Sequence, residues 1–416
     1  MASLFTREFY QAAANALEDD GMLLQWVQAY EVDAETVRTI YATVASVFPV
    51  VETWHLKSDD LLLIASARPR QLDVSRLRSR LEGEPFRSAF ARAWRTTELE
   101  GVLAHYVAGP GTAAAIADGE GGAINTDDRN RVEFGFARSL GGNTDFTVND
   151  VRAMARSRND GTPRTRGGDV DWRRADEHVI TLLADEGLVI SRPDAGQGAA
   201  IAHRIAALNA FSKADSARVL AEWRAQSEEP AGPTELAVVA TALADAGNEA
   251  ASGYIDAMRG FDAAEADVTL ARLRFRQGRS EDAMRSLEAG FAAYRADPWP
   301  LPTVMLRALS VSVELIARNP ALATRMWTAL RTPFCMRLAD EVRKKVAAFA
   351  AHLMAPGPAC VEANEALEPN PVWTEEFLTS RAACYEQTAH PLAPRARNDI
   401  REFLRLAPTR FSLPPG

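Results

Sequence analysis

The chain has 416 residues, of which 47% are hydrophobic and 25% charged, and its formal net charge is -9 at pH 7. This length predicts two or three domains with a buried core, and the composition is that of an ordinary globular protein. The acidic balance argues against a nucleic-acid partner, which usually leaves a basic footprint. No uncharged apolar run reaches the ~20 residues needed to span a bilayer, so we expect a cytoplasmic chain without a transmembrane segment.

The chain begins with a predicted helix that leads into a strand. Thr6 is expected to cap the helix and Gly21 to end it. Residues 22–27 are a short apolar run behind this glycine, which is typical of a strand covered on both faces. On this interpretation Trp26 belongs to the core.

A second helix and a hairpin are expected next. Asp33 is placed to cap a helix that stops at Pro49. Residues 50–56 and 61–67 indicate two strands joined by a tight turn, which makes them antiparallel neighbours. The order helix, strand, helix and hairpin is typical of the last elements, in chain order, of a domain with an open α/β sheet.

Several separated blocks of this region carry a family resemblance. They are, in chain order, Leu4-Phe5-Thr6-Arg7-Glu8-Phe9-Tyr10, residues 21–30, Phe48-Pro49, residues 61–65, and Asn125-Thr126-Asp127-Asp128-Arg129 followed by Val132-Glu133-Phe134. Together they resemble the second half of the spermidine synthase (polyamine aminopropyltransferase) domain, in the bacterial branch where that domain is often fused to membrane segments. The resemblance implies a partial class I methyltransferase-like (Rossmann-like) sheet.

The same resemblance implies that half of an active site is absent. The family's nucleotide-binding half should precede Leu4, and no G-x-G-x-x-G-like turn follows a strand anywhere in the sequence. We therefore predict no catalytic, cofactor-binding or metal-binding residue in this chain. Decarboxylated S-adenosylmethionine, the family's cosubstrate, would bind only if the missing half were supplied.

The resemblance places three substrate-binding residues around the end of the first strand, namely Gln25, Tyr30 and Glu31. A positioned amide such as Gln25 can accept a hydrogen bond from an ammonium group without carrying charge, and a carboxylate can hold a cationic polyamine. The alternative for Gln25 is a strand-end side chain that satisfies local backbone. The alternative for Glu31 is a favourable charge ahead of the Asp33 helix.

Other polar residues are expected to be structural. Asp127 and Asp128 indicate a turn that caps its own backbone, with cation binding as the alternative. The six histidines show no metal-ligand spacing. The three cysteines lie far apart with no C-x-x-C, which signals neither a disulfide framework nor zinc and fits a reducing compartment.

The domain plan follows from where the patterns change. Residues 1–69 form the α/β remnant, residues 70–145 a helical and extended extension, residues 146–171 an arginine- and glycine-rich linker, and residues 172–416 a helical domain. Ala217, Ala250 and Ala283 recur at an equal spacing, and the turn glycines Gly247 and Gly278 follow a similar one. This resembles a degenerate tetratricopeptide repeat, with a generic helical bundle as the alternative.

Two functional hypotheses follow. In the first, the chain is the carboxyl-terminal part of a spermidine synthase-like enzyme of polyamine biosynthesis and is inactive alone. Its partners would be a polyamine and a missing amino-terminal half or membrane-anchored parent. In the second, it is a non-catalytic helical-repeat module that binds a protein partner and carries a vestigial α/β segment. Under either view we expect the unpaired edge of strand 22–27 to cause self-association.

Overall fold

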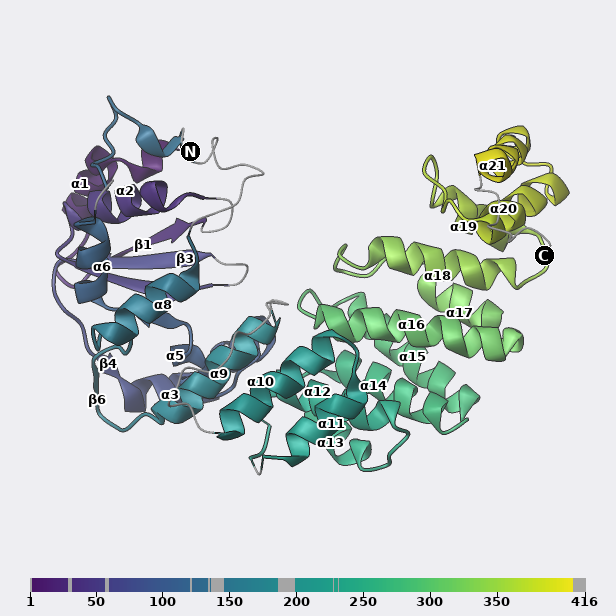
Figure 1. Cartoon of the computed structure of the whole chain (residues 1–416), viewed down its shortest axis with the longest axis horizontal. Coiled ribbons are helices and arrows are strands. Elements are labelled where there is room, and N and C mark those ends of the chain that lie inside the picture. Colours follow the sequence, from purple (N-terminus) through teal and green to yellow (C-terminus); the bar gives the residue numbers. More distant parts are fainter. Residues whose placement is uncertain are drawn as a thin grey trace, which may run out of the picture. The chain divides into compact units, whose positions relative to one another are not determined.

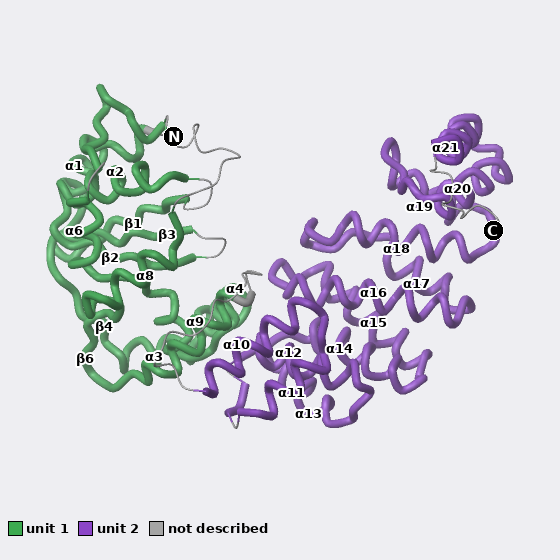
Figure 2. Tube along the Cα trace, in the orientation of Figure 1, with its two compact units in different colours: residues 1–189 green, residues 190–416 purple. Residues whose placement is uncertain are grey.

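The computed structural model describes residues 2–28, 32–56, 60–119, 122–133, 135, 146–185, 199–226, 228–230 and 232–406. The chain divides into two compact units, residues 1–189 and residues 190–416 (Figure 2). The described residues are mostly helical, and the first unit also holds a small antiparallel sheet (Figure 1). A sheet with helices followed by a helical region was the predicted order, and at this level it is confirmed.

The predicted caps begin the first two long helices. Thr6 Oγ1 accepts a hydrogen bond from the Phe9 backbone N–H at 3.3 Å, and Asp33 Oδ1 accepts one from Thr36 at 2.6 Å. Each cap satisfies an N–H group that has no partner within its own helix. The elements are η1 (Ala2–Phe5), α1 (Arg7–Ala16), β1 (Met22–Val27), α2 (Ala34–Ala45), β2 (Val50–His55) and β3 (Leu61–Ser66).

The four-stranded sheet has the order β1-β3-β2-β5, where β5 is Tyr106–Ala108. Strand β3 is antiparallel to both β1 and β2, as predicted for the hairpin, so β1 and β2 run parallel to each other. With α2 between them in the chain, these two strands form a split βαβ unit.

One face of this sheet carries the core of the first unit. Leu63 and Ala65 of β3 are fully buried there with Val27 and Val51 of the neighbouring strands. Helices α1, α2, α6 (Pro110–Ala117) and α8 (Val148–Ser157) contribute buried side chains to the same cluster. These four helices thus lie on the same face of the sheet.

The prediction that strand 22–27 is covered on both faces is wrong. Met22, Leu24 and Trp26 alternate with the inward-facing residues and are 39%, 54% and 44% exposed. Trp26 is therefore a surface residue rather than a core residue. An uninterrupted apolar run cannot show by itself which of its two faces is covered, since that depends on elements far away in the chain.

Short helices follow the sheet, largely as predicted, and are α3 (Val74–Glu82), α4 (Phe86–Ala93), α5 (Leu99–Leu103) and α6. Helix α5 ends at Leu103, and beyond it Tyr106 and Ala108 pair with β2 as strand β5. Residues 131–133 are helical.

The segment predicted as a linker, residues 146–171, is folded. Thr147 and Asp150 form a reciprocal capping box at the start of α8, and Val148, Val151 and Ala155 enter the core of the sheet. Further on, β6 (Thr165–Arg166) pairs in parallel with β4 (Leu72–Asp73). The arginines and glycines suggested a solvated chain, but the apolar stripe of α8 outweighs them.

The helix α9 (Trp172–Asp185) belongs to the first unit, so the predicted start of the helical domain at residue 172 lies too early. Glu98 of the first unit accepts hydrogen bonds from His178 at 2.7 Å and Arg174 at 3.0 Å. These hydrogen bonds lower the pKa of Glu98 to about 2, and the bond from His178 has the largest effect. A charged network therefore ties α9 to the sheet-bearing unit.

The second unit consists of helices that pack in successive pairs, α10 on α11, α12 on α13 and α14 on α15, with α12 and α16 both packing on α14. The elements are α10 (Ala199–Ser212), α11 (Ser216–Arg224), α12 (Pro233–Asp245), α13 (Ala251–Arg259), α14 (Ala263–Arg276), α15 (Ser280–Tyr294), α16 (Pro302–Arg318), η2 (Pro320–Leu322), α17 (Ala323–Leu330), α18 (Asp340–His352), α19 (Pro358–Glu365), α20 (Glu375–Gln387) and α21 (Ala393–Leu406).

The residues on which the repeat was predicted do not share one environment, although buried positions do recur at an equal spacing. Gly247 and Gly278 have positive φ angles, in the left-handed region that turn glycines favour. Ala217 and Ala250 are exposed, however, whereas Ala283 is buried. The buried positions recur at an equal spacing of their own, as Val219, Ala251 and Ala283 and again as Trp223, Ile255 and Leu287.

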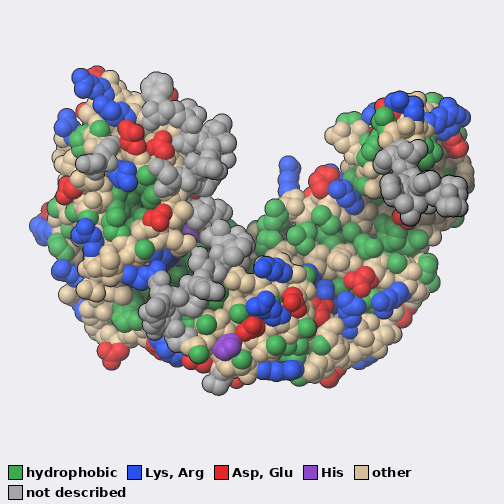
Figure 3. Space-filling view, viewed as in Figure 1, with side chains coloured by type: hydrophobic (Ala, Val, Ile, Leu, Met, Phe, Trp, Pro, Cys, Tyr) green, Lys and Arg blue, Asp and Glu red, His purple; other side chains and the backbone are tan. Residues whose placement is uncertain are grey.

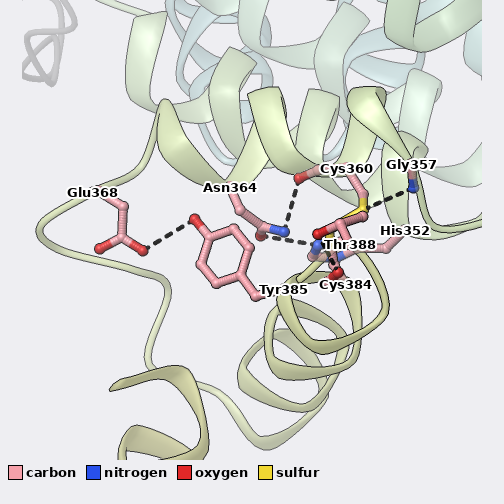
Figure 4. The surroundings of a disulfide bond; sticks show 8 residues. All are labelled: His352, Gly357, Cys360, Asn364, Glu368, Cys384, Tyr385 and Thr388. Carbon is pink, nitrogen blue, oxygen red and sulfur yellow. Dashed lines mark hydrogen bonds between the residues drawn. A yellow bond between two sulfur atoms is a disulfide. The ribbon is translucent and has the colours of Figure 1, made fainter. Parts of the chain in front are cut away.

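The second unit also contains a disulfide that the sequence did not predict. Cys360 of α19 and Cys384 of α20 are bonded, with their Cα atoms 6.2 Å apart (Figure 4). Around it, Asn364 donates to the Cys360 carbonyl at 2.9 Å and Thr388 to the Cys384 carbonyl at 2.8 Å. The packing of the two helices brings these cysteines together. Because such bonds persist in oxidising compartments, the disulfide does not fit the expected reducing environment.

Within the described ranges, no helix combines the length and apolarity that crossing a bilayer requires.

Candidate functional site

The residues predicted to bind substrate belong to the end of β1 and the segment after it, and one of them is described. Gln25 is half-buried, and its Oε1 accepts a hydrogen bond from the Tyr10 hydroxyl at 3.3 Å. Its Nε2 donates to the Trp26 carbonyl at 2.9 Å. Burial raises the pKa of Tyr10, so its hydroxyl stays protonated and donates. Gln25 thus makes local hydrogen bonds, while Tyr30 and Glu31 lie outside the described residues.

Strand β1 is an edge strand on the side away from β3. In the part of the chain that the structure describes, it pairs with β3 alone, from Met22 opposite Ser66 to Val27 opposite Leu61. The backbone N–H and C=O groups of every second residue of β1 therefore point away from the sheet. Such an edge is a template for pairing with another strand.

The open face of the sheet continues from this edge. Leu24 lies opposite Ile64 and Trp26 opposite Leu62, and both β3 residues are half-buried. On β2, Glu52 lies opposite Ile64 on the same face. Burial raises the pKa of Glu52, and the charge of Arg70 opposes that rise. The apolar surface is thus bounded by a carboxylate beside an arginine.

Farther along β2 the face is closed. Trp54 packs edge-on against Tyr106 and joins a cluster with the buried Leu99 and Leu103. The surface available to another molecule is therefore the β1 and β3 part of the face. We call the exposed residues Met22, Leu24 and Trp26, together with Leu62 and Ile64, the open apolar face.

Asp127 and Asp128 lie in a turn, as the sequence predicted. Both side chains are exposed, and Thr126 pairs with Arg129 across the turn. The anchor is Asn125, which is fully buried and accepts from the Arg131 backbone N–H at 2.7 Å. Among the described residues no cluster of three histidine, cysteine, aspartate or glutamate side chains could hold a metal ion.

A buried histidine pair joins β2 to the loop before β5. His105 Nδ1 lies 2.7 Å from the His55 carbonyl, and its ring stacks on Trp94. Burial, aided by the charges of Arg152 and His105, lowers the pKa of His55 to about 3. Both histidines are buried, which fits the structural role predicted for them.

Sequence reasoning missed a cleft of about 750 Å³ at the other end of β1, lined by Gly21, Ser66 and six arginines. The arginines come from two segments far apart in the chain, so the sequence alone gave no sign that they meet. No known family model, curated protein or solved structure matches this chain.

Proposed function

We propose that this chain is the acceptor-side part of a spermidine synthase-like aminopropyltransferase and that it acts when a nucleotide-binding α/β half docks on β1. The observation that carries the proposal is the edge of β1, which pairs with no second strand among the described residues, with the open apolar face beside it.

The sheet supports docking of an α/β partner in particular. In doubly wound folds the parallel strands are covered by helices on both faces. Here β1 and β2 are parallel, helices cover one face, and Leu24 and Trp26 are exposed on the other. A docked half would add a strand to the edge of β1 and lay its helices on the open apolar face.

The chemistry assigned to this chain is positioning of the amine. In the family, an aminopropyl group moves from decarboxylated S-adenosylmethionine to an amine nitrogen, and an Asp of the other half orients that nitrogen. A carbonyl oxygen has two lone pairs, so Gln25 Oε1 can accept from an ammonium group while keeping its bond from Tyr10. Tyr30 and Glu31, which follow in the chain, are proposed to hold the rest of the polyamine. Orientation of this kind lowers the barrier mainly by proximity.

The test is reconstitution of transfer. The full chain is expressed with the product of the adjoining upstream reading frame, and movement of a labelled aminopropyl group onto putrescine or spermidine is measured. We expect transfer by the pair and none by this chain alone. Leu24→Asp with Trp26→Asp should abolish both the transfer and co-purification of the pair, because charge on the open apolar face blocks docking.

Leu338→Asp is the matched control, since Leu338 is 65% exposed but lies in the helical unit. It should leave transfer unchanged. Transfer by the isolated chain, or an upstream product that neither binds nor restores transfer, would contradict the proposal.

The alternative function, a helical module that binds a protein partner, is favoured by a different surface. Hydrophobic side chains gather over α16 and α18 (Figure 3), and these helices carry Leu306 and Val342, which are 40% and 38% exposed. Cross-linking of a purified partner to α16 and α18 would support this function if Leu306→Asp with Val342→Asp removed it and Leu24→Asp did not.

A further inference from the structure

The cleft of about 750 Å³ beside the start of β1 is rich in arginine. Six arginines line it against three aspartates, Asp19, Asp20 and Asp73. The whole chain has a net charge of -9, so this surface differs in sign from the protein around it. The lining arginines are Arg68, Arg70, Arg76, Arg80, Arg164 and Arg166.

The fold assembles the cleft from two distant segments. Strands β4 and β6 pair Leu72 with Thr165 and Asp73 with Arg166, and the Leu72 N–H donates to the Arg164 carbonyl at 2.8 Å. Gly167, just after β6, has a positive φ, and a side chain there would approach Asp73. A glycine at this position lets the chain pass close to the start of α3 and fixes the β6 segment with its arginines beside it.

Two of the three aspartates already have partners. Asp19 pairs with Arg68 at 3.1 Å, and Asp73 caps α3 through the Arg76 N–H at 3.0 Å. Asp73 also lies 3.7 Å from Arg166. The carboxylates therefore neutralise one part of the cleft and leave the other part positive.

The other four arginines form no ion pair with a carboxylate among the described residues. Arg76 and Arg80 are one helical turn apart and so share one face of α3. Arg70 is half-buried, and its Nη1 is fully enclosed without a hydrogen-bond acceptor among the described atoms. Its charge also opposes the rise in the pKa of Glu52, so a carboxylate balances Arg70 in part.

The lining indicates the kind of anion. Guanidinium groups bind phosphate through paired N–H donors, and several of them on different elements suit a ligand with more than one phosphate. The volume lies in the range of small-molecule sites, and Pro69, Leu72 and Leu77 offer apolar contact for an organic group. A cationic polyamine would be repelled here, which separates the cleft from the amine site at the other end of β1.

We propose that this cleft binds an organic phosphate carrying two or more phosphate groups. The inference stands independently of the proposed aminopropyl transfer.

The experiment is titration calorimetry of the full chain with inorganic triphosphate, ATP, citrate and spermidine at low salt. We expect binding of triphosphate and tighter binding of ATP, weaker binding of citrate, and none of spermidine. Added salt should weaken the affinity, because charge attraction dominates. Failure of triphosphate and ATP to bind would overturn the proposal, as would preferential binding of single-stranded nucleic acid or of anionic vesicles.

Variants locate the binding. Arg76→Gln with Arg80→Gln should weaken ATP binding about 10- to 100-fold, the loss expected for removing charged hydrogen bonds. Arg70→Gln should weaken it about 10-fold. Arg87→Gln with Arg92→Gln, two exposed arginines of α4 outside the cleft, is the matched control and should bind normally. Equal losses in the control pair, with melting curves showing all variants folded, would contradict the assignment.

Discussion

Each of the two units has its own stabilising contacts, and the residues that make these contacts are separated by different distances along the sequence. In the helical unit, many ion pairs join helices that are close in the chain, as when Arg274 meets Glu249 across 25 residues or Arg331 meets Glu362 across 31, although Arg307 also reaches the Phe211 carbonyl across 96. In the sheet-bearing unit, Glu98 and His178 are 80 residues apart. Helices that pack on their neighbours in the chain can therefore be recognised from local periodicity, whereas the sheet unit depends on contacts that no local pattern encodes.

The largest expected effect lies in the helical unit, where Arg381 is fully enclosed and bonds Glu368 and Asp399, each at 2.8 Å. Arg381→Ala leaves two carboxylates without their cation and should lower the free energy of unfolding by about 3–5 kcal/mol. Denaturant unfolding measures the loss. Arg401→Ala, at an exposed position of α21, is the control. This control should lower the free energy of unfolding by about 0.5 kcal/mol or less.

The disulfide should contribute the next largest stabilisation. It joins two cysteines with a sequence separation of 24. Removing it by Cys360→Ala with Cys384→Ala should therefore lower the free energy of unfolding by about 3 kcal/mol. Denaturant unfolding with and without reductant should give the same loss for the parent chain. The exposed free cysteine provides a control, because Cys335→Ser should change neither curve. If reductant left the unfolding of the parent unaltered, this helix pair would owe its stability to packing alone.

A third prediction concerns how the stability of the sheet-bearing unit depends on pH. The fold keeps His55 neutral down to about pH 3, whereas the unfolded chain takes up this proton near pH 6.5. The lowered pKa therefore has no effect on stability above pH 6.5. Below it, stability falls by up to about 1.4 kcal/mol per pH unit, because the unfolded chain binds the extra proton. His55→Gln should flatten this dependence in denaturant unfolding between pH 6.5 and 4.

The smallest effect on stability is expected at the edge strand. Leu24 is 54% exposed. Leu24→Lys should therefore change the free energy of unfolding by about 0.5 kcal/mol or less. Its effect on association should be large, because lysine on an edge strand opposes pairing with a second copy. Sedimentation should show the parent chain associating and the variant monomeric. A monomeric parent chain would show that the edge of β1 does not self-pair.

Much of the local structure could be predicted from particular residues. Thr6 and Asp33 fix the starts of two helices because a cap needs only its own neighbours, and Gly247 and Gly278 fix turns because they adopt a positive φ. The hairpin of β2 and β3 followed for the same reason, since its two strands are consecutive. For the candidate site, the sequence identified the strand that carries Gln25 but not the direction of its hydrogen bonds.

What the sequence by itself determined is the first helices and strands with their caps, several turns, and an acidic chain with a helical second part. Only the tertiary structure decided which face of β1 is covered, that Cys360 meets Cys384, and that arginines from residues 68–80 and 164–166 share one cleft. The physical reason is the range of the interactions. Backbone conformation responds to adjacent residues, whereas burial, covalent pairing and charge clustering depend on segments brought together only when the chain is folded.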